Sequence, residues 1–72
     1  MTRGVRRLLQ AMLDGERLLQ DGRRFVLSTS RRVVHRATVD QAMQLEYVAR
    51  VFPPRAYVLM PRGVMALARE KS

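Results

Sequence analysis

The 72-residue chain contains no cysteine and no tryptophan, and it has one histidine, one lysine and six acidic residues. Without cysteine it forms neither a disulfide framework nor a thiolate metal site, and His35 alone cannot supply a histidine cluster. The chain also lacks the run of about 18–20 apolar residues that a membrane-spanning helix needs. We therefore expect a soluble, cytoplasmic protein without metal or other cofactor, whose core is held by side-chain packing.

Arrangements that would support catalysis are also missing. The six acidic residues are spread among predicted turns and helix ends, and the four glycines lie too far apart for a phosphate-binding loop. Ser28, Thr29 and Ser30 are candidate nucleophiles only if His35 reaches one of them, and no acid at a recognisable spacing would orient that histidine. A chain of this length buries only about 60% of its unfolded surface, which leaves little room for a substrate pocket. We do not expect an enzyme.

Positive charge is the strongest compositional feature that is present. Thirteen arginines and one lysine oppose six carboxylates, so the formal net charge is +8. A surface with this excess attracts phosphate polymers or acidic protein faces. Because 47% of the residues are hydrophobic, the chain has enough apolar content to fold, and we expect one domain over residues 1–72.

The amino-terminal segment has the pattern of an amphipathic helix. Apolar residues at positions 5, 8, 9, 12 and 13 recur with the 3.6-residue period of a helix that buries one face. Thr2 is placed to cap its start, and Gly15 is placed to end it in a left-handed conformation. Arg3, Arg6 and Arg7 are expected on the exposed side.

Two interpretations are open for residues 17–28. The Asp21-Gly22 pair between two apolar runs predicts a tight two-stranded hairpin with a type I′ turn, in which both central residues have positive φ. In the alternative, the first helix continues through Gly15 to Gln20, because Leu19 could share its apolar face.

The middle of the chain predicts a second helix. Residues 29–32 predict a polar turn, with a short extended segment at 33–34, and His35 is expected to line a turn or to be half-buried. Thr38 and Gln41 fit a capping box, in which the threonine hydroxyl accepts from the Gln41 amide and the Gln41 side chain accepts from the Thr38 amide. The helix should therefore start at Thr38. Its inner face is expected to contain Val39, Ala42, Met43 and Leu45.

The last third of the chain predicts a second hairpin and a short closing helix. Residues 48–52 and 56–60 read as strands, and Pro53-Pro54-Arg55 between them reads as a loop. Pro61 suits the first position of a helix that would end before the polar tail at 69–72. The apolar residues of this helix are Val64, Met65, Leu67 and Ala68. The aromatic residues, which we expect to pack in or beside the core, are Phe25, Tyr47, Phe52 and Tyr57.

The order helix, hairpin, helix, hairpin, short helix indicates a small α+β domain. Residues 57–67, with the sequence YVLMPRGVMAL, are similar to the Tyr-x-Leu-Thr-Pro-x-Gly pattern that joins the wing to the terminal helix in winged-helix domains. Residues 37–67 as a whole resemble the second half of such a domain. The resemblance implies a compact winged-helix-like variant with a hairpin after the first helix. It also implies that the helix from Thr38 is the recognition helix and that residues 53–55 form the wing tip.

The predicted recognition helix has few residues suited to reading bases. Its exposed positions carry Asp40, Gln41 and Gln44, and phosphate would repel the aspartate. We therefore expect DNA binding to rely on contacts between arginines and the phosphate backbone, chiefly through Arg31, Arg32 and Arg36, which lead into a helix N-terminus. The candidate nucleic-acid-binding residues are Arg3, Arg6, Arg7, Arg31, Arg32, Arg36, Gln41, Gln44, Arg50 and Arg55.

The function expected from these residues is that of a prokaryotic or phage transcriptional regulator that contacts the DNA backbone. The alternative is a phage-type inhibitor or adaptor that binds an acidic surface of a host protein assembly, since the same charge would favour that partner. A homodimer would suit either function, because one domain of this size has little surface to commit.

Overall fold

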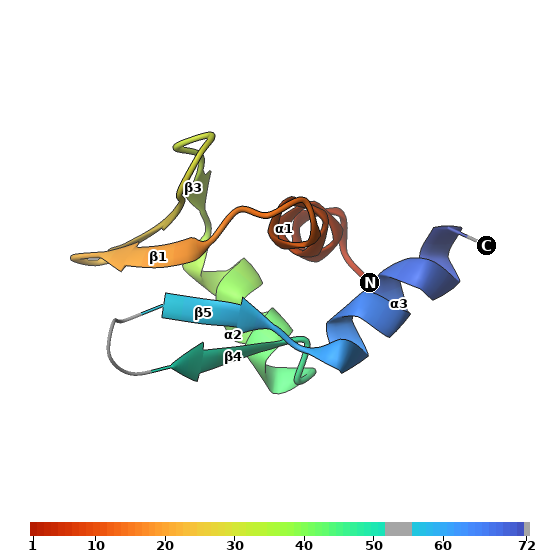
Figure 1. Ribbon diagram of the computed structural model, residues 1–72. Helices are drawn as coiled ribbons and strands as arrows, with labels where there is room; N and C mark the ends of the chain where they lie inside the picture. The colour runs from red at the N-terminus through yellow and green to blue at the C-terminus, as the bar shows by residue number, and fades with distance from the viewer. Residues whose placement is uncertain (52–55, 72) are drawn as a thin grey trace.

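The computed structural model describes residues 1–51 and 56–71, and in that part of the chain it has three helices and five strands (Figure 1). This is a small α+β domain, as the order of sequence patterns predicted. The expected core residue Phe52 and the expected loop at 53–55 lie outside the described residues. The elements are α1 (Arg3–Leu13), β1 (Leu18–Asp21), β2 (Arg24–Leu27), β3 (Val33–Val34), α2 (Arg36–Gln44), β4 (Val48–Val51), β5 (Ala56–Leu59) and α3 (Pro61–Lys71).

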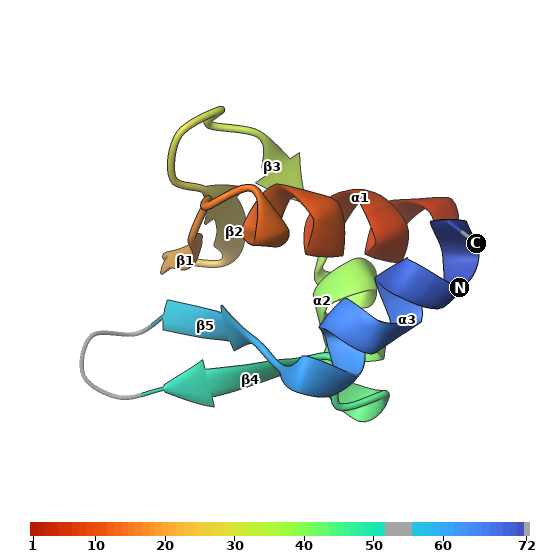
Figure 2. The same ribbon diagram turned by 45° about the vertical axis from the view of Figure 1, so that its right-hand side comes forward.

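The five strands form one antiparallel sheet in the order β3-β2-β1-β5-β4. Both expected hairpins are present, and the pairing of β1 with β5 joins them, with Leu18 opposite Tyr57 and Leu19 opposite Ala56. Figure 2 shows the hairpins projecting to the left, with the helices gathered toward the centre and right. No helix in the described ranges is long and apolar enough to cross a membrane.

Side chains from all three helices and four of the strands form the core. Phe25 and Tyr57 are 7% and 5% exposed and meet edge to face, with ring centroids 5.6 Å apart, which confirms their expected burial. Tyr47 is half-buried and packs against the core, also as expected. The buried residues are Val5, Leu8, Leu9, Met12, Leu18, Phe25, Leu27, Val39, Ala42, Val48, Ala56, Tyr57 and Leu67.

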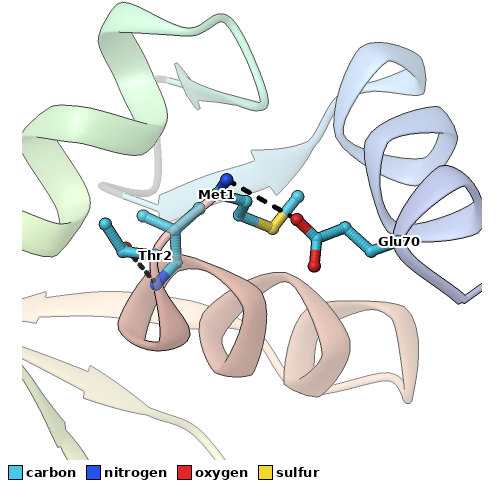
Figure 3. Close-up of polar contacts among 4 residues, drawn as sticks. Met1, Thr2 and Glu70 are labelled. Atoms are coloured by element: carbon cyan, nitrogen blue, oxygen red, sulfur yellow. Dashed lines mark hydrogen bonds and ion pairs between the residues drawn. The ribbon is translucent and has the colours of Figure 1, made fainter.

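Helix α1 follows the predicted pattern closely. The Thr2 hydroxyl accepts a hydrogen bond from the Val5 amide at 3.2 Å, and the Met1 amino group lies 3.5 Å from the Glu70 carboxylate of α3 (Figure 3). Four of the five expected apolar positions are buried, but Leu13 is 47% exposed, so its expected burial is wrong. At 3.6 residues per turn Leu13 lies about 80° around the helix from Val5, at the border of the buried stripe.

The end of α1 decides between the two interpretations of residues 17–28. Gly15 has φ +106°, its amide donates to the Met12 carbonyl, and the Glu16 amide donates to the Ala11 carbonyl. These two hydrogen bonds, together with the left-handed conformation of Gly15, form a Schellman motif, which terminates a helix. The hairpin is therefore confirmed, and continuation of the helix to Gln20 is wrong.

The turn of the first hairpin differs from the predicted one. Asp21 pairs with Arg24, so the two central residues are Gly22 and Arg23 rather than Asp21 and Gly22. Gly22 has φ +62°, whereas Arg23 is not among the residues with positive φ, as in a type II′ turn rather than type I′. A type II′ turn needs glycine at its first central position, so Gly22-Arg23 satisfies the hairpin as well as Asp21-Gly22 would, and Leu18 then lies opposite Leu27.

Helix α2 starts earlier than predicted. Its cap position is His35, which makes no side-chain capping bond, and the amides of Thr38 and Val39 donate to the His35 carbonyl. The capping box of Thr38 with Gln41 is therefore wrong. Thr38 instead lies against α1, where a side-chain carbon on Gly4 would come within 3.1 Å of its hydroxyl. Val39 and Ala42 are buried as expected, but Met43 and Leu45 are exposed.

The carboxyl end of α2 and the start of α3 meet at Tyr47. Glu46 adopts φ +61°, its amide donates to Met43, and the Tyr47 amide donates to Ala42, so a glutamate occupies the position that glycine usually holds in a Schellman motif. Helix α3 begins at Pro61 as predicted but extends to Lys71, farther than expected. Of its four expected apolar residues only Leu67 is buried.

Candidate nucleic-acid interface

A groove of about 350 Å³ lies between α1, the loop after β2 and the start of α2. Arg7 from α1, Arg32 from the loop and His35 from the cap position of α2 all line it. Two of the predicted site residues are thus brought together from segments 25 residues apart in the chain. His35 is exposed at the cap position of α2, so its expected half-burial is wrong. Apolar lining comes from Leu8, Ala11, Leu27, Val33 and Val34.

The loop that carries Arg31 and Arg32 is folded back on β2. The Leu27 amide donates to the Arg32 carbonyl at 2.9 Å, and the Arg31 amide donates to the Leu27 carbonyl at 3.1 Å. Arg31 has φ +61°, a left-handed conformation that is unfavourable for a side chain with Cβ. Both arginine side chains are exposed, so the loop presents two adjacent cations to solvent.

Helix α2 begins at the groove, and its first turn adds positive potential. The first amides of a helix have no partner within the helix and form the positive end of its dipole, which favours anions. The His35 side chain does not cap them. Arg36, also in this turn, is 80% exposed and lies 3.9 Å from the Asp40 carboxylate, a long ion pair that leaves its charge accessible to solvent.

A carboxylate also lies in the groove. Glu16 lines it, and its Oε1 atom accepts hydrogen bonds from the backbone amides of Ser30 at 2.7 Å and Thr29 at 3.1 Å. The Ser30 amide is the main cause of a lowered pKa at Glu16, and the positive charge of Arg32 acts in the same direction. Glu16 therefore remains ionised at neutral pH.

The other predicted site residues lie elsewhere. Arg3 and Arg6 are exposed on α1, and Gln41 and Gln44 are exposed on α2 together with Asp40. Arg50 lies with Arg62 beside a second groove of about 570 Å³, at the opposite end of α2. Arg50 is thus separated from the groove that holds Arg7 and Arg32. Arg55 lies outside the described residues.

The surroundings of α2 differ from those of a recognition helix. Residues 14–35 contain no helix, so α2 follows β3 directly and has no preceding partner with which to form a helix-turn-helix. Its exposed side presents an aspartate and two glutamines, as the sequence predicted. Among residues 1–51 and 56–71, no three histidine or acidic side chains come together in a way that could hold a metal ion.

Two features of the site were not identified from the sequence. Glu16 gave no local signal, because its partners lie 13 and 14 residues farther along the chain. Arg62 is part of the winged-helix-like run, but nothing in that run indicated its 2.6 Å ion pair with Glu46, which follows α2. Both contacts depend on how separate elements pack.

Comparison with known proteins finds no family model that matches this chain, no similar protein among curated sequences and no similar solved structure. The case for a function therefore rests on the residues of the chain itself.

Proposed function

We propose that this protein is a cytoplasmic DNA-binding protein that grips the phosphate backbone and acts as a prokaryotic or phage transcriptional regulator. The observation that carries the proposal is the groove where Arg7, Arg32 and His35, from three different elements, meet at the start of α2. Arginine forks and helix N-termini both bind phosphate oxygens, and such contacts make up much of the affinity of DNA-binding proteins. The net charge of +8 supports the same partner.

Binding of this kind would depend weakly on base sequence. The groove offers the cations Arg7 and Arg32, which suit phosphates, whereas Asp40, Gln41 and Gln44 on α2 offer few contacts to base edges. We also propose that the fold is a compact relative of winged-helix domains. The pairing of β1 with β5 and of β5 with β4 supports this, as does the position of α2 immediately before the β4–β5 hairpin.

A salt titration tests the proposal. Fluorescence anisotropy would measure the affinity for a duplex of arbitrary sequence between about 50 and 200 mM salt, the range over which phosphate contacts make DNA binding strongly salt-dependent. With about six phosphate contacts, log K should fall against log salt with a slope near −5. A flat response, or no binding at the lowest salt, would contradict DNA binding.

Matched triple variants then test the site. Replacing Arg31, Arg32 and Arg36 with glutamine should reduce the slope by about three and weaken binding equally for all sequences. Of the three replaced arginines only Arg32 lines the groove, and Arg31 and Arg36 flank it in sequence. The control is a second triple glutamine variant at Arg23, Arg24 and Arg62, which lie outside residues 31–36, so that both proteins have the same net charge. Equal losses in the two variants would show that only total charge matters. Far-UV circular dichroism verifies that each variant is folded.

The second groove favours a second candidate function, which is binding of an acidic protein surface. Met43 and Met60 line this groove with Arg50 and Arg62, and methionine side chains adapt readily to a partner while the arginines attract carboxylates. A stoichiometric protein that co-purifies with the tagged chain would support this function if Arg50→Glu releases it and the triple variant at Arg31, Arg32 and Arg36 retains it. Release by that triple variant and retention by Arg50→Glu would contradict it.

A further inference from the structure

We propose that Glu16 is a positioning residue for DNA binding: its carboxylate holds the loop at 28–32 in the shape that presents Arg31 and Arg32 to the phosphate backbone. This inference rests on the proposed function and assigns a role to Glu16, the one anionic side chain among the described residues that line the groove. Glu16 itself is not expected to touch DNA.

Four hydrogen bonds tie the segment after α1 to this loop. One oxygen of Glu16 accepts from the amides of Thr29 and Ser30. At the next residue, the Arg17 amide donates to the Ser28 hydroxyl at 2.9 Å, and the Ser28 amide donates back to the Arg17 carbonyl at 2.9 Å. Residues 28–30 are thus held by bonds to the segment between α1 and β1. Among these four bonds, Glu16 is the one residue of that segment that contributes its side chain, whereas Arg17 contributes backbone atoms.

The second half of the loop is bonded to β2 through the Leu27 contacts of Arg31 and Arg32, and it joins the first half at Ser30. Ser30, whose amide makes the 2.7 Å bond to Glu16, comes immediately before Arg31, which holds a left-handed conformation that a residue with Cβ adopts only when its surroundings impose it. The Ser30 hydroxyl reaches the Arg32 amide only at 3.5 Å, a weak contact. Without the carboxylate, the amides of Thr29 and Ser30 would turn to water, and only the two backbone bonds to Leu27 would still oppose relaxation of Arg31 from this conformation.

Charge alone predicts the opposite effect on DNA binding. Glu16 lies in the groove with Arg7 and Arg32, and a carboxylate at this place repels phosphate. Removing it raises the formal net charge from +8 to +9, which by itself should tighten binding. A carboxylate that positions the arginines should instead weaken binding when it is removed. The two roles therefore differ in the sign of the change.

The experiment compares Glu16→Ala with Asp21→Ala, which removes the same charge from the exposed end of β1. Duplex affinity and its salt slope are measured by anisotropy for both variants and for the wild type. We expect Asp21→Ala to bind as tightly as the wild type or up to about threefold more tightly, and Glu16→Ala to bind several-fold more weakly, with a slope smaller by one to two as arginine–phosphate contacts are lost. Glu16→Gln, whose amide oxygen still accepts both hydrogen bonds, should restore the slope.

Several outcomes would overturn this role. Glu16→Ala binding as tightly as Asp21→Ala would mean that the carboxylate acts only as a charge. A smaller affinity with an unchanged salt slope would indicate a general loss of stability rather than misplaced arginines. Should Glu16→Ala fail to fold, Glu16→Asp carries the test, because it keeps the charge but is one methylene too short, and wild-type affinity in that variant would contradict positioning.

A failure of the proposed function is distinguishable from a failure of this inference. If the wild type does not bind DNA at any salt concentration, the proposed function is wrong and this role falls with it. Amide hydrogen exchange at Thr29 and Ser30 reports loop order without DNA. Faster exchange in Glu16→Ala with unchanged exchange in β2 supports positioning when the wild type binds DNA, and unchanged exchange at both amides overturns it.

Discussion

Replacing Gly63 with alanine tests the closest approach between two elements of the fold. A Cβ at this position would lie 2.6 Å from the Tyr47 carbonyl oxygen and 2.9 Å from a methyl carbon of Leu59. A carbon and a carbonyl oxygen normally stay about 3.3 Å apart, so α3 would have to move by about 0.7 Å. The same Tyr47 oxygen accepts a hydrogen bond from the Met60 amide at 2.8 Å, and that movement would stretch the bond to its limit.

The expected loss of stability follows from these terms. Overpacking costs about 1–3 kcal/mol and the weakened hydrogen bond about 1 kcal/mol, while the higher helix propensity of alanine returns up to about 1 kcal/mol. The net destabilisation is about 1–4 kcal/mol, a large part of the 4–11 kcal/mol that is roughly expected for a domain of this length. The melting temperature should fall by about 5–30 °C.

Urea denaturation followed by far-UV circular dichroism measures this change. The matched control is Gly4→Ala, the same substitution near the start of another helix. There the new Cβ would meet the Thr38 hydroxyl at 3.1 Å, a side-chain contact that can adjust, so we expect stability within about 0.5 kcal/mol of the wild type. Equal midpoints for Gly63→Ala and Gly4→Ala would refute the argument that α3 is held against the Tyr47 backbone.

Two further predictions concern Glu46 and Glu16. In urea denaturation, Glu46→Gly should be more stable than Glu46→Ala by about 1 kcal/mol. Both variants lose the ion pair with Arg62, but only glycine adopts the left-handed conformation of residue 46 without strain. Equal stabilities would contradict this. The folded-state pKa of Glu16 lies below its ordinary value of 4.5, so its bonds to the loop stabilise the fold fully above pH 4.5 and are lost as the pH falls through the lowered pKa. The Ser30 amide should lose hydrogen-exchange protection over that acidic range. Constant protection down to acid unfolding would refute the conclusion that the ionised Glu16 carboxylate holds this amide.

Signals confined to a few neighbouring residues predicted much of the fold. The spacing of apolar residues with Thr2 and Gly15 at its ends defined α1, and Pro61 marked the start of α3. Each of these features stabilises its element through contacts within a turn or two of the chain. The two hairpins were predicted for the same reason, since turn residues and flanking apolar runs are adjacent in sequence.

Local signals failed where the same residues were compatible with more than one arrangement. Thr38 and Gln41 satisfied the capping pattern, yet α2 starts at Arg36, where the chain leaves its pairing with β2 and turns toward α1. The turn of the first hairpin moved by one residue, because Gly22 also suits the first central position of a type II′ turn. In both cases the local pattern was compatible with two arrangements and did not select between them.

The candidate site shows the same division. Composition alone established the net charge of +8 and the supply of arginines, and α1 and the approach to α2 were identified as places where they cluster. Packing then placed Arg7 beside Arg32 and separated Arg50 from both. The bonds of Glu16 to the loop, and the pairing of β1 with β5 that joins the hairpins, likewise connect residues far apart in the chain. Such contacts leave no local pattern, because they form only when the hydrophobic face of each element is buried against the others.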